Sequence, residues 1–352
     1  MLTPLFIAIA IAALGFLIVV HEGGHYFVAR WCKMRIERFS IGFGPGLLKK
    51  TSKKTGTTFQ LAPIPFGGFV EIRGMNIAED VDPEDKHAYP NRPVWQRFLT
   101  IFAGPATNYL SAIVIAFGLY TCHGIDVKHW DSIGRVMPGY DAYGKLQPGD
   151  RIIAVDHAPH YGDSGPSLGE RVNQAKGAPL TLTVERDGHN LDIQIKPQLD
   201  KGDADKPIWR IGVEHVPFVV KVGFLDAAEH ALEYPVVQTK QIGTELYKIV
   251  FGSEKADMGG PVRMVQEFYR AFSTATIDGI RLVMALSVYL GLFNLLPIPA
   301  LDGGRLVFLV YEMVTRRRAN PKIETMVHMA GIMALGVVML VVLYIDIRRF
   351  WT

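Results

Sequence analysis

Four long runs of apolar residues constrain this chain more than any other feature of its sequence. Each run is nearly free of charge and close to the roughly 20 residues that a helix needs to cross about 30 Å of hydrocarbon. The runs are Leu2–Val20, Phe98–Tyr120, Leu282–Leu296 with a further apolar stretch after it, and Met326–Ile345. Composition agrees, since 49% of the 352 residues are hydrophobic and only 20% are charged. We therefore expect an α-helical membrane protein with four transmembrane helices.

The first run differs from a cleaved secretory signal. No basic segment precedes it, no small-residue cleavage site follows it, and its helical pattern continues through His21 to Arg30. We interpret this run as a retained membrane helix.

Basic residues are concentrated in two of the segments between the runs. Twelve Lys or Arg and eight Asp or Glu lie between the first apolar run and the second, and a cluster of four basic residues occupies 316–322. The positive-inside rule makes both segments cytoplasmic, so both termini and the segment 121–280 are expected outside. Arg348 and Arg349 do not fit this pattern, because they are basic residues near the C-terminus that is expected outside. Cys32 and Cys122 then lie on opposite faces and cannot form a disulfide. The net charge of +3 is too small to indicate a nucleic-acid partner.

The first cytoplasmic segment contains short strand-like patterns separated by glycine and proline. Ile36–Phe43, Phe59–Leu61 and Phe69–Ile72 fit this description. They are too apolar for a solvated loop and too few for a domain. We expect β-hairpins associated with the membrane, where irregular backbone is tolerated if it is buried in protein or lines a cavity.

The outer segment contains a compact α/β module over about 130–213. Its predicted elements are strands at 133–136, 151–155, 180–184 and 191–195, with a helix at 167–175. This order, and the sequences at Pro138–Ala142 and Leu146–Asp150, resemble a PDZ domain, which holds a peptide end at a sheet edge. From Phe218 to Ile249 the pattern becomes that of an amphipathic helix on the outer surface.

The clearest chemical motif is an H-E-x-x-H sequence, His21-Glu22-Gly23-Gly24-His25, at the inner end of the first membrane helix. Imidazoles at i and i+4 share one helical face, where both can reach one metal ion. Glu22 lies beside them and can accept a proton from a water that the metal activates. Such groups at a bilayer boundary are costly to desolvate without a partner. The plain alternative is a polar helix end with solvated histidines.

A catalytic zinc needs a third protein ligand, and Asp302 is the best candidate. Two prolines before it and two glycines after it break the third apolar run, so its carboxylate can turn toward the core. Asp302 could instead cap the helix that follows. The presence of His21 and His25 in the same membrane core favours the ligand role. The other nine histidines are interpreted as surface or structural residues.

Six segments spread over nearly the whole chain match one family in order. They are His21–His25, Glu37–Gly44, Pro65–Val70, Ala103–Pro105 with Asn108, Gly259–Val262, and Asn294–Asp302. On these segments the chain resembles the site-2 proteases, in particular the bacterial RseP type (regulator of sigma-E protease). Members of this type from enteric bacteria contain two tandem PDZ-like domains, whereas the outer segment of this chain is long enough for only one.

The resemblance implies a zinc endopeptidase of the bacterial inner membrane, with its active site toward the cytoplasmic side. Such enzymes cut single-pass membrane proteins after another protease has trimmed the outer domain; anti-sigma factors and remnant signal peptides are the substrate class. It also implies that Asn294 helps to hold the substrate or the oxyanion. The β-segments around Gly42, Gly67 and Gly68 would pair with an unwound substrate strand, since a helical peptide bond is shielded by its own hydrogen bonds.

The predicted organisation therefore has four parts. Residues 1–120 form the first half of the membrane metalloprotease core, 121–215 the PDZ-like periplasmic domain, 216–280 a periplasmic amphipathic helical segment, and 281–352 the second half of the core.

Three other classes of protein fit the sequence less well. A catalytically silent membrane adaptor would not need the base Glu22. A transporter can also have broken helices and buried acids, but it would not need H-E-x-x-H with a third ligand. A different membrane zinc protease would lack the L-D-G sequence at Leu301–Gly303 and the PDZ-like insert.

Overall fold

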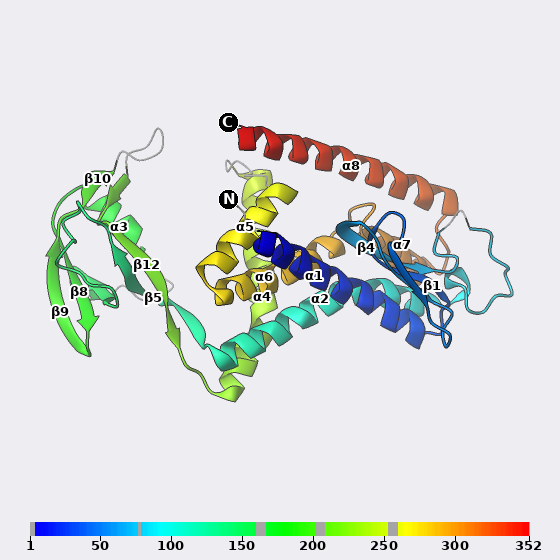
Figure 1. Ribbon diagram of the computed structural model, residues 1–352, viewed down its shortest axis with the longest axis horizontal. Coiled ribbons are helices and arrows are strands. Elements are labelled where there is room, and N and C mark those ends of the chain that lie inside the picture. The colour runs from blue at the N-terminus through cyan, green and yellow to red at the C-terminus, as the bar shows by residue number, and fades with distance from the viewer. Residues whose placement is uncertain (1–3, 77–78, 160–166, 201–207, 253–259, 352) are drawn as a thin grey trace. The chain divides into compact units, whose positions relative to one another are not determined.

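The computed structural model describes residues 4–76, 79–159, 167–200, 208–252 and 260–351; Gly259 of the family-like segments lies outside them. The chain divides into two compact units. The first consists of Met1–Leu119 and Ala228–Thr352, and the second of Tyr120–Ala227. Figure 1 labels the main helices and strands of both units.

Four helices of the first unit are long and apolar enough to cross a membrane. They are α1 (Pro4–Trp31), α2 (Val94–Cys122), α6 (Thr276–Leu295) and α8 (Pro321–Trp351), with candidate spans Ala8–Trp31, Val94–Cys122, Thr276–Leu295 and Pro321–Asp346. The predicted four-helix fold class is confirmed. The first helix also continues without a break through the H-E-x-x-H motif, as its pattern predicted.

Helices α1 and α2 approach each other closely through glycines. A Cβ atom built at Gly24 of α1 would lie 2.3 Å from the carbonyl oxygen of Ala103 in α2, so no larger residue fits there. Gly104 of α2 lies against the ring of His25 in the same way, at 2.2 Å from Nε2 to a built Cβ. A glycine within a helix costs about 1 kcal/mol relative to alanine. At Gly24 and Gly104, close helix packing offsets that cost.

The strands between the first and second membrane helices form one four-stranded sheet rather than separate hairpins. Its strands are β1 (Ile36–Phe43), β2 (Leu48–Thr51), β3 (Thr58–Leu61) and β4 (Ile64–Ile72), in the order β2-β3-β1-β4. Only β2 and β3 form a hairpin, because β1 pairs with β3 in parallel and with β4 antiparallel. The predicted strands exist, but the hairpin prediction was wrong for β1 and β4, whose pairing is set by packing over a longer range.

The sheet packs beside the second half of α1 (Figure 1). Its contact is a small buried cluster that joins the end of the helix to the central and edge strands; its members are Ala29, Cys32, Met34, Ile36 and Ile72. This cluster fixes β4 along the part of α1 that carries the histidines.

The third membrane helix, α6, ends at Leu295, and α7 (Asp302–Thr315) begins after a turn over 296–301. Leu301 rather than Asp302 is the N-cap residue of α7, and it makes no side-chain capping hydrogen bond. An ion pair between Arg97 of α2 and Glu312 of α7 holds α7 in place, with Nη2 to Oε1 at 2.5 Å and Nη1 to Oε2 at 3.1 Å. This unit also contains most of α4 (Phe224–Phe251), α5 (Pro261–Thr274) and a short 3-10 helix over Tyr89–Asn91.

The second unit is built on a sheet with the order β12-β5-β6-β8-β9. The elements are β5 (Ile125–Val136), β6 (Arg151–Val155), β7 (Ala158–Pro159), α3 (Leu168–Gln174), β8 (Leu180–Arg186), β9 (His189–Ile195), β10 (Gln198–Asp200), β11 (Ile208–Arg210) and β12 (Val213–Val220). Helix α3 begins with a capping box between Ser167 and Glu170. The predicted helix from Phe218 was wrong at its start, because Phe218–Val220 pair with β5 and the helix begins at Phe224.

Candidate metal centre

The two histidines of the H-E-x-x-H motif and Asp302 come together in the first unit. His21 Nε2 lies 3.1 Å from Asp302 Oδ2, His25 Nε2 lies 3.3 Å from the same oxygen, and the two Nε2 atoms are 3.3 Å apart. Both histidines are buried. In the part of the chain that the structure describes, these are the only three His, Cys, Asp or Glu residues grouped closely enough to hold a metal ion.

The spacing of these three atoms fits a tetrahedral zinc site. Ligands about 2.0–2.2 Å from a tetrahedral zinc lie about 3.3–3.6 Å from one another, and two nitrogens with one oxygen is a common ligand set for catalytic zinc. Apart from the two rings, Asp302 Oδ2 has no hydrogen-bond donor among the described residues although it is buried. A buried carboxylate oxygen that faces only two imidazoles is accounted for by a cation between them.

Helix α2 contacts the Nδ1 atom of each histidine ring and so orients both rings. The carbonyl oxygen of Thr100 lies 2.8 Å from His25 Nδ1, and the Asn108 side-chain amide lies 3.1 Å from His21 Nδ1. A carbonyl can only accept, so His25 Nδ1 carries its proton and Nε2 is free for a metal. Rotating the Asn108 amide by half a turn would place Oδ1, which has no partner among the described residues, on His21 Nδ1 and do the same for that ring.

These orienting groups were not assigned from the sequence. Asn108 was identified only as part of a family-like segment. An amide side chain within an apolar helix is a sequence signal for a functional residue, and the structure shows that this amide is fully buried. Thr100 acts through its backbone carbonyl, which no sequence pattern can identify. Outer partners of this kind set the tautomer and direction of a metal-bound histidine.

Comparison with known proteins agrees with this geometry. The model of the family described as Peptidase family M50 matches residues 9–339, which is most of the chain. The chain belongs to peptidase family M50. The zinc and metalloprotease predictions are thereby confirmed, and the chain is a multi-pass membrane protein with four candidate spans.

Three relatives of this M50 peptidase, each provisionally named a zinc metalloprotease, resemble it over most of their length. One from Rickettsia conorii is 30% identical and covers 97% of this chain and 98% of its own. One from Brucella suis is 34% identical over 84% of this chain and 83% of its own. One from Mesorhizobium japonicum is 32% identical over 90% and 91%.

Strand β4 of the M50 peptidase lies beside Glu22. A Cβ atom built at Gly68 would be 2.8 Å from Ile18 Cγ2 and 3.3 Å from Glu22 Cγ, so the glycine lets the strand approach α1. The backbone of Val70 in β4 is within hydrogen-bonding reach of the Glu22 carboxylate. The side chain next to the metal ligands therefore points toward the edge strand of the sheet.

The other predicted substrate-binding residues have different surroundings. Gly42 and Gly67 have φ angles of +87° and +118°, and Cβ atoms built there would lie 2.8 Å from the Ala62 carbonyl oxygen and 2.3 Å from the Phe43 ring, respectively. The backbone conformation and the close contacts at these two positions are sufficient to require glycine, whether or not a substrate binds there. Asn294 is half-buried in the last turn of α6, before the turn that leads to Asp302.

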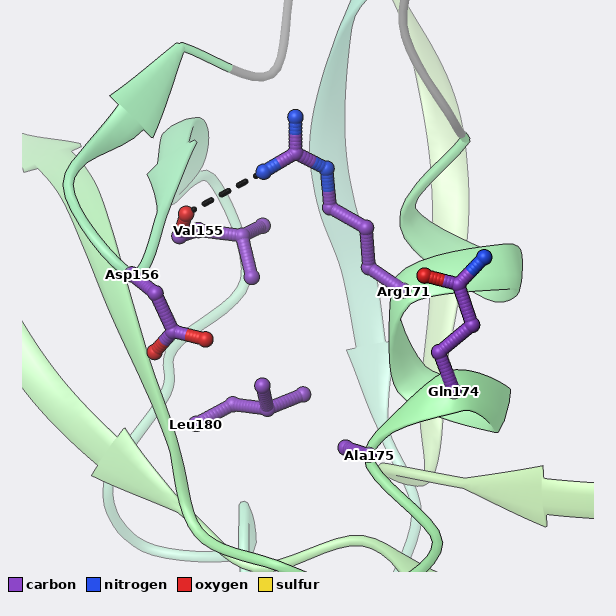
Figure 2. Close-up of a pocket in the computed structure, with 6 residues that line it drawn as sticks. All are labelled: Val155, Asp156, Arg171, Gln174, Ala175 and Leu180. Carbon is purple, nitrogen blue, oxygen red and sulfur yellow. Dashed lines mark hydrogen bonds between the residues drawn. The ribbon is translucent and has the colours of Figure 1, made fainter.

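A pocket also lies in the second unit, between α3 and the strands β6 and β8 (Figure 2). It is lined by Val155, Asp156, Arg171, Gln174, Ala175 and Leu180. Its charged side chains are engaged: Arg171 Nη1 donates to the Val155 carbonyl at 3.3 Å, and Asp156 Oδ1 accepts from the Thr181 backbone N–H at 2.8 Å. We therefore assign the M50 chemistry to the metal centre and not to this pocket.

Proposed function

We propose that this M50 peptidase is an intramembrane endopeptidase of the site-2 type, close to the RseP type, that cleaves the membrane-spanning segments of single-pass proteins. The observation that carries the proposal is the position of the metal centre. His21, Glu22 and His25 lie within the candidate span Ala8–Trp31, and the histidines are buried against a second span. A peptidase site at that place is suited to a substrate that is itself in the membrane.

The proposed roles follow from the contacts of each residue. His21, His25 and Asp302 would hold the zinc ion, which when bound supplies Lewis-acid polarisation to the hydrolysis. Glu22 accepts a proton from the attacking water as the new C–O bond forms, and it returns the proton to the amide nitrogen as the C–N bond breaks. Asn294, at the end of α6, is the candidate for holding the developing oxyanion or the substrate strand.

Strand β4 is the candidate for presenting the substrate. It is the last strand of the sheet, so one of its edges is not paired within that sheet. A helical substrate must unwind before its peptide bond can be attacked, and an edge strand supplies replacement hydrogen bonds. Since Gly68 and Val70 of β4 lie next to Glu22, a strand added there would bring its backbone to the base.

The proposed orientation places the sheet and the metal centre toward the cytoplasm, and both termini and the PDZ-like module in the periplasm. Its support is the excess of Lys and Arg in the two segments named above. A reporter that matures only outside the inner membrane should be active when fused after Trp130 and inactive after Lys54 or Arg318. The reverse pattern would overturn the orientation.

Anti-sigma factors and remnant signal peptides are the proposed substrates, and substrate trapping is the direct test. A Glu22→Gln chain with zinc bound should retain uncut membrane proteins, which are then identified after purification. Each captured protein is reconstituted with the wild-type enzyme in lipid vesicles, and the site of cleavage is mapped. Cleavage that falls only in soluble segments would contradict the intramembrane proposal.

A further inference from the structure

Helix α8 contributes no ligand to the metal centre, yet it packs on the turn that leads to Asp302. His328 Nδ1 accepts a hydrogen bond from the backbone N–H of Ala300 at 3.3 Å. One turn further along α8, a Cβ atom built at Gly331 would lie 2.4 Å from Pro299 Cβ and 2.6 Å from its carbonyl oxygen. Two points of α8 therefore contact the backbone just before the third ligand.

Two N–H groups of the turn bond within it, from Ile298 to the Leu296 carbonyl at 2.7 Å and from Leu301 to the Ile298 carbonyl at 3.2 Å, whereas the N–H of Ala300 finds its acceptor outside the turn. Pro297 and Pro299 have no N–H to donate. Ala300 has a φ angle of +79°, in the left-handed region that disfavours any residue with a Cβ atom. Its N–H group is the one that His328 binds. The strained residue of the turn is thus the residue that α8 holds.

His328 is an unusual side chain for its position. It is half-buried in a helix whose other side chains are mostly apolar, and its ring packs against Phe308 of α7 with centroids 5.8 Å apart. Because Nδ1 accepts, a neutral ring carries its proton on Nε2, which is buried without a hydrogen-bond partner among the residues that the structure describes. An apolar side chain would avoid that unfavourable desolvation, so packing alone does not explain a histidine here.

We propose that His328 is a positioning residue of the metal centre. By accepting the N–H of Ala300 it holds the left-handed turn, and the turn directs the Asp302 carboxylate onto His21 and His25. Gly331 assists by allowing the α8 backbone to lie directly on Pro299. The inference rests on the proposed role of Asp302 as a zinc ligand.

The test compares two substitutions of His328. Leucine fills the space but cannot accept a hydrogen bond, whereas asparagine offers an acceptor oxygen near the position of Nδ1. His328→Leu should lower zinc affinity about 10- to 100-fold, as losses of outer partners of metal ligands do. His328→Asn should stay close to wild type, as should the control Met329→Leu at an exposed position of α8. Zinc affinity is measured on detergent-purified protein by competition with a chromogenic chelator.

A second pair of variants tests the same idea without changing the histidine. Gly331→Ala should push α8 away from Pro299 and weaken zinc binding, with a lower kcat and an unchanged KM. Gly336→Ala is the matched control, because nothing lies within 4 Å of a Cβ atom built there. It adds the same methyl group to the same helix, so its zinc affinity should equal that of wild type.

Three outcomes distinguish a failure of the positioning role from a failure of the assignment of Asp302 as a zinc ligand. Wild-type zinc affinity in both His328→Leu and Gly331→Ala would overturn the positioning role, provided that Asp302→Ala loses zinc. An equal loss in His328→Asn and His328→Leu would also overturn it, since the acceptor would then be irrelevant. Zinc retained in Asp302→Ala would show that the ligand assignment itself is wrong.

Discussion

The metal centre of the first unit and the Asp150 site of the second differ in how their buried carboxylates are hydrogen-bonded. In the second unit, Asp150 is 1% exposed and fully engaged: it accepts from Arg186 Nε and Nη2, both at 2.7 Å, and from the Gln147 backbone N–H at 2.8 Å. In the first unit, Asn108 Oδ1 has no partner among the described residues, and Asp302 Oδ2 faces only two imidazoles.

This difference separates groups that hold the fold from groups that are reserved for a ligand. A buried charge is expensive unless the chain pairs it, so a structural carboxylate is surrounded by donors. A carboxylate that serves a metal keeps an oxygen open for the ion. The following predictions test whether the two regions differ in function as their hydrogen bonding indicates.

The largest effect is expected from removing a ligand. His21→Ala, His25→Ala and Asp302→Ala should each lose zinc and all measurable peptidase activity, because two ligands do not make a stable zinc site. Elemental analysis of detergent-purified protein measures the metal. Full zinc occupancy in Asp302→Ala would remove Asp302 from the site and break the contrast with Asp150.

Replacing the base should separate chemistry from metal binding. Glu22→Gln retains the size of the side chain but cannot accept a proton, so cleavage should fall about 10²- to 10⁴-fold while zinc occupancy is unchanged. The readouts are the kcat on a membrane substrate and the zinc content. If activity survives in this variant, another group accepts the proton.

The structural carboxylate should behave in the opposite way. Asp150→Ala leaves the Arg186 guanidinium without its carboxylate, and breaking a buried pair costs about 3–5 kcal/mol. The isolated second unit should therefore lose stability against urea, while the full-length variant keeps its zinc. Zinc loss in the full-length Asp150→Ala protein would mean that the two units are not independent in this respect.

Removing the outer partner of a ligand should have a smaller effect than removing the ligand. Asn108→Ala leaves His21 Nδ1 without its neighbour, and zinc affinity should fall about 10- to 100-fold. Competition with a chelator measures the change. Ser111→Ala, one turn away on α2, is the control, because its hydroxyl contacts Ser287 and the Asn108 carbonyl rather than a ligand. Equal losses in both variants would point to helix packing instead.

The smallest effect on peptidase activity is expected from deleting the second unit, which we propose acts as a filter against untrimmed substrates. Ile125 and Val220 are paired in register, so a short Gly-Ser linker can replace the residues between them. A folded, zinc-bound deletion variant should cleave a short, pre-trimmed membrane substrate normally and should also cleave longer ones. Loss of activity on the short substrate would show that this unit presents substrates instead.

Local patterns predicted the parts of this protein whose causes are local. Apolar runs predicted all four candidate spans, because a helix must be apolar over a whole span to be stable in a bilayer. The spacing of His21 and His25 predicted a shared helical face, because the helix repeats every 3.6 residues. Within the second unit, apolar alternation predicted strands at 180–184 and 191–195, and these residues lie in the paired strands β8 and β9.

Contacts between segments far apart in the sequence were harder to predict from local patterns. The sequence left two roles open for Asp302, a zinc ligand or a helix cap. Its distance from the histidines depends on where α6 ends and on how α7 packs on α2. The pairing of β1 with β4, the carbonyl of Thr100 behind His25 and the contact of His328 with Ala300 carry no mark in the sequence. The sequence by itself determined the membrane helices and the residue types of the metal centre, because hydrophobicity and helical periodicity act along the chain. Only the tertiary structure decided which backbone and side-chain groups orient those residues, because that depends on close packing between helices far apart in the sequence.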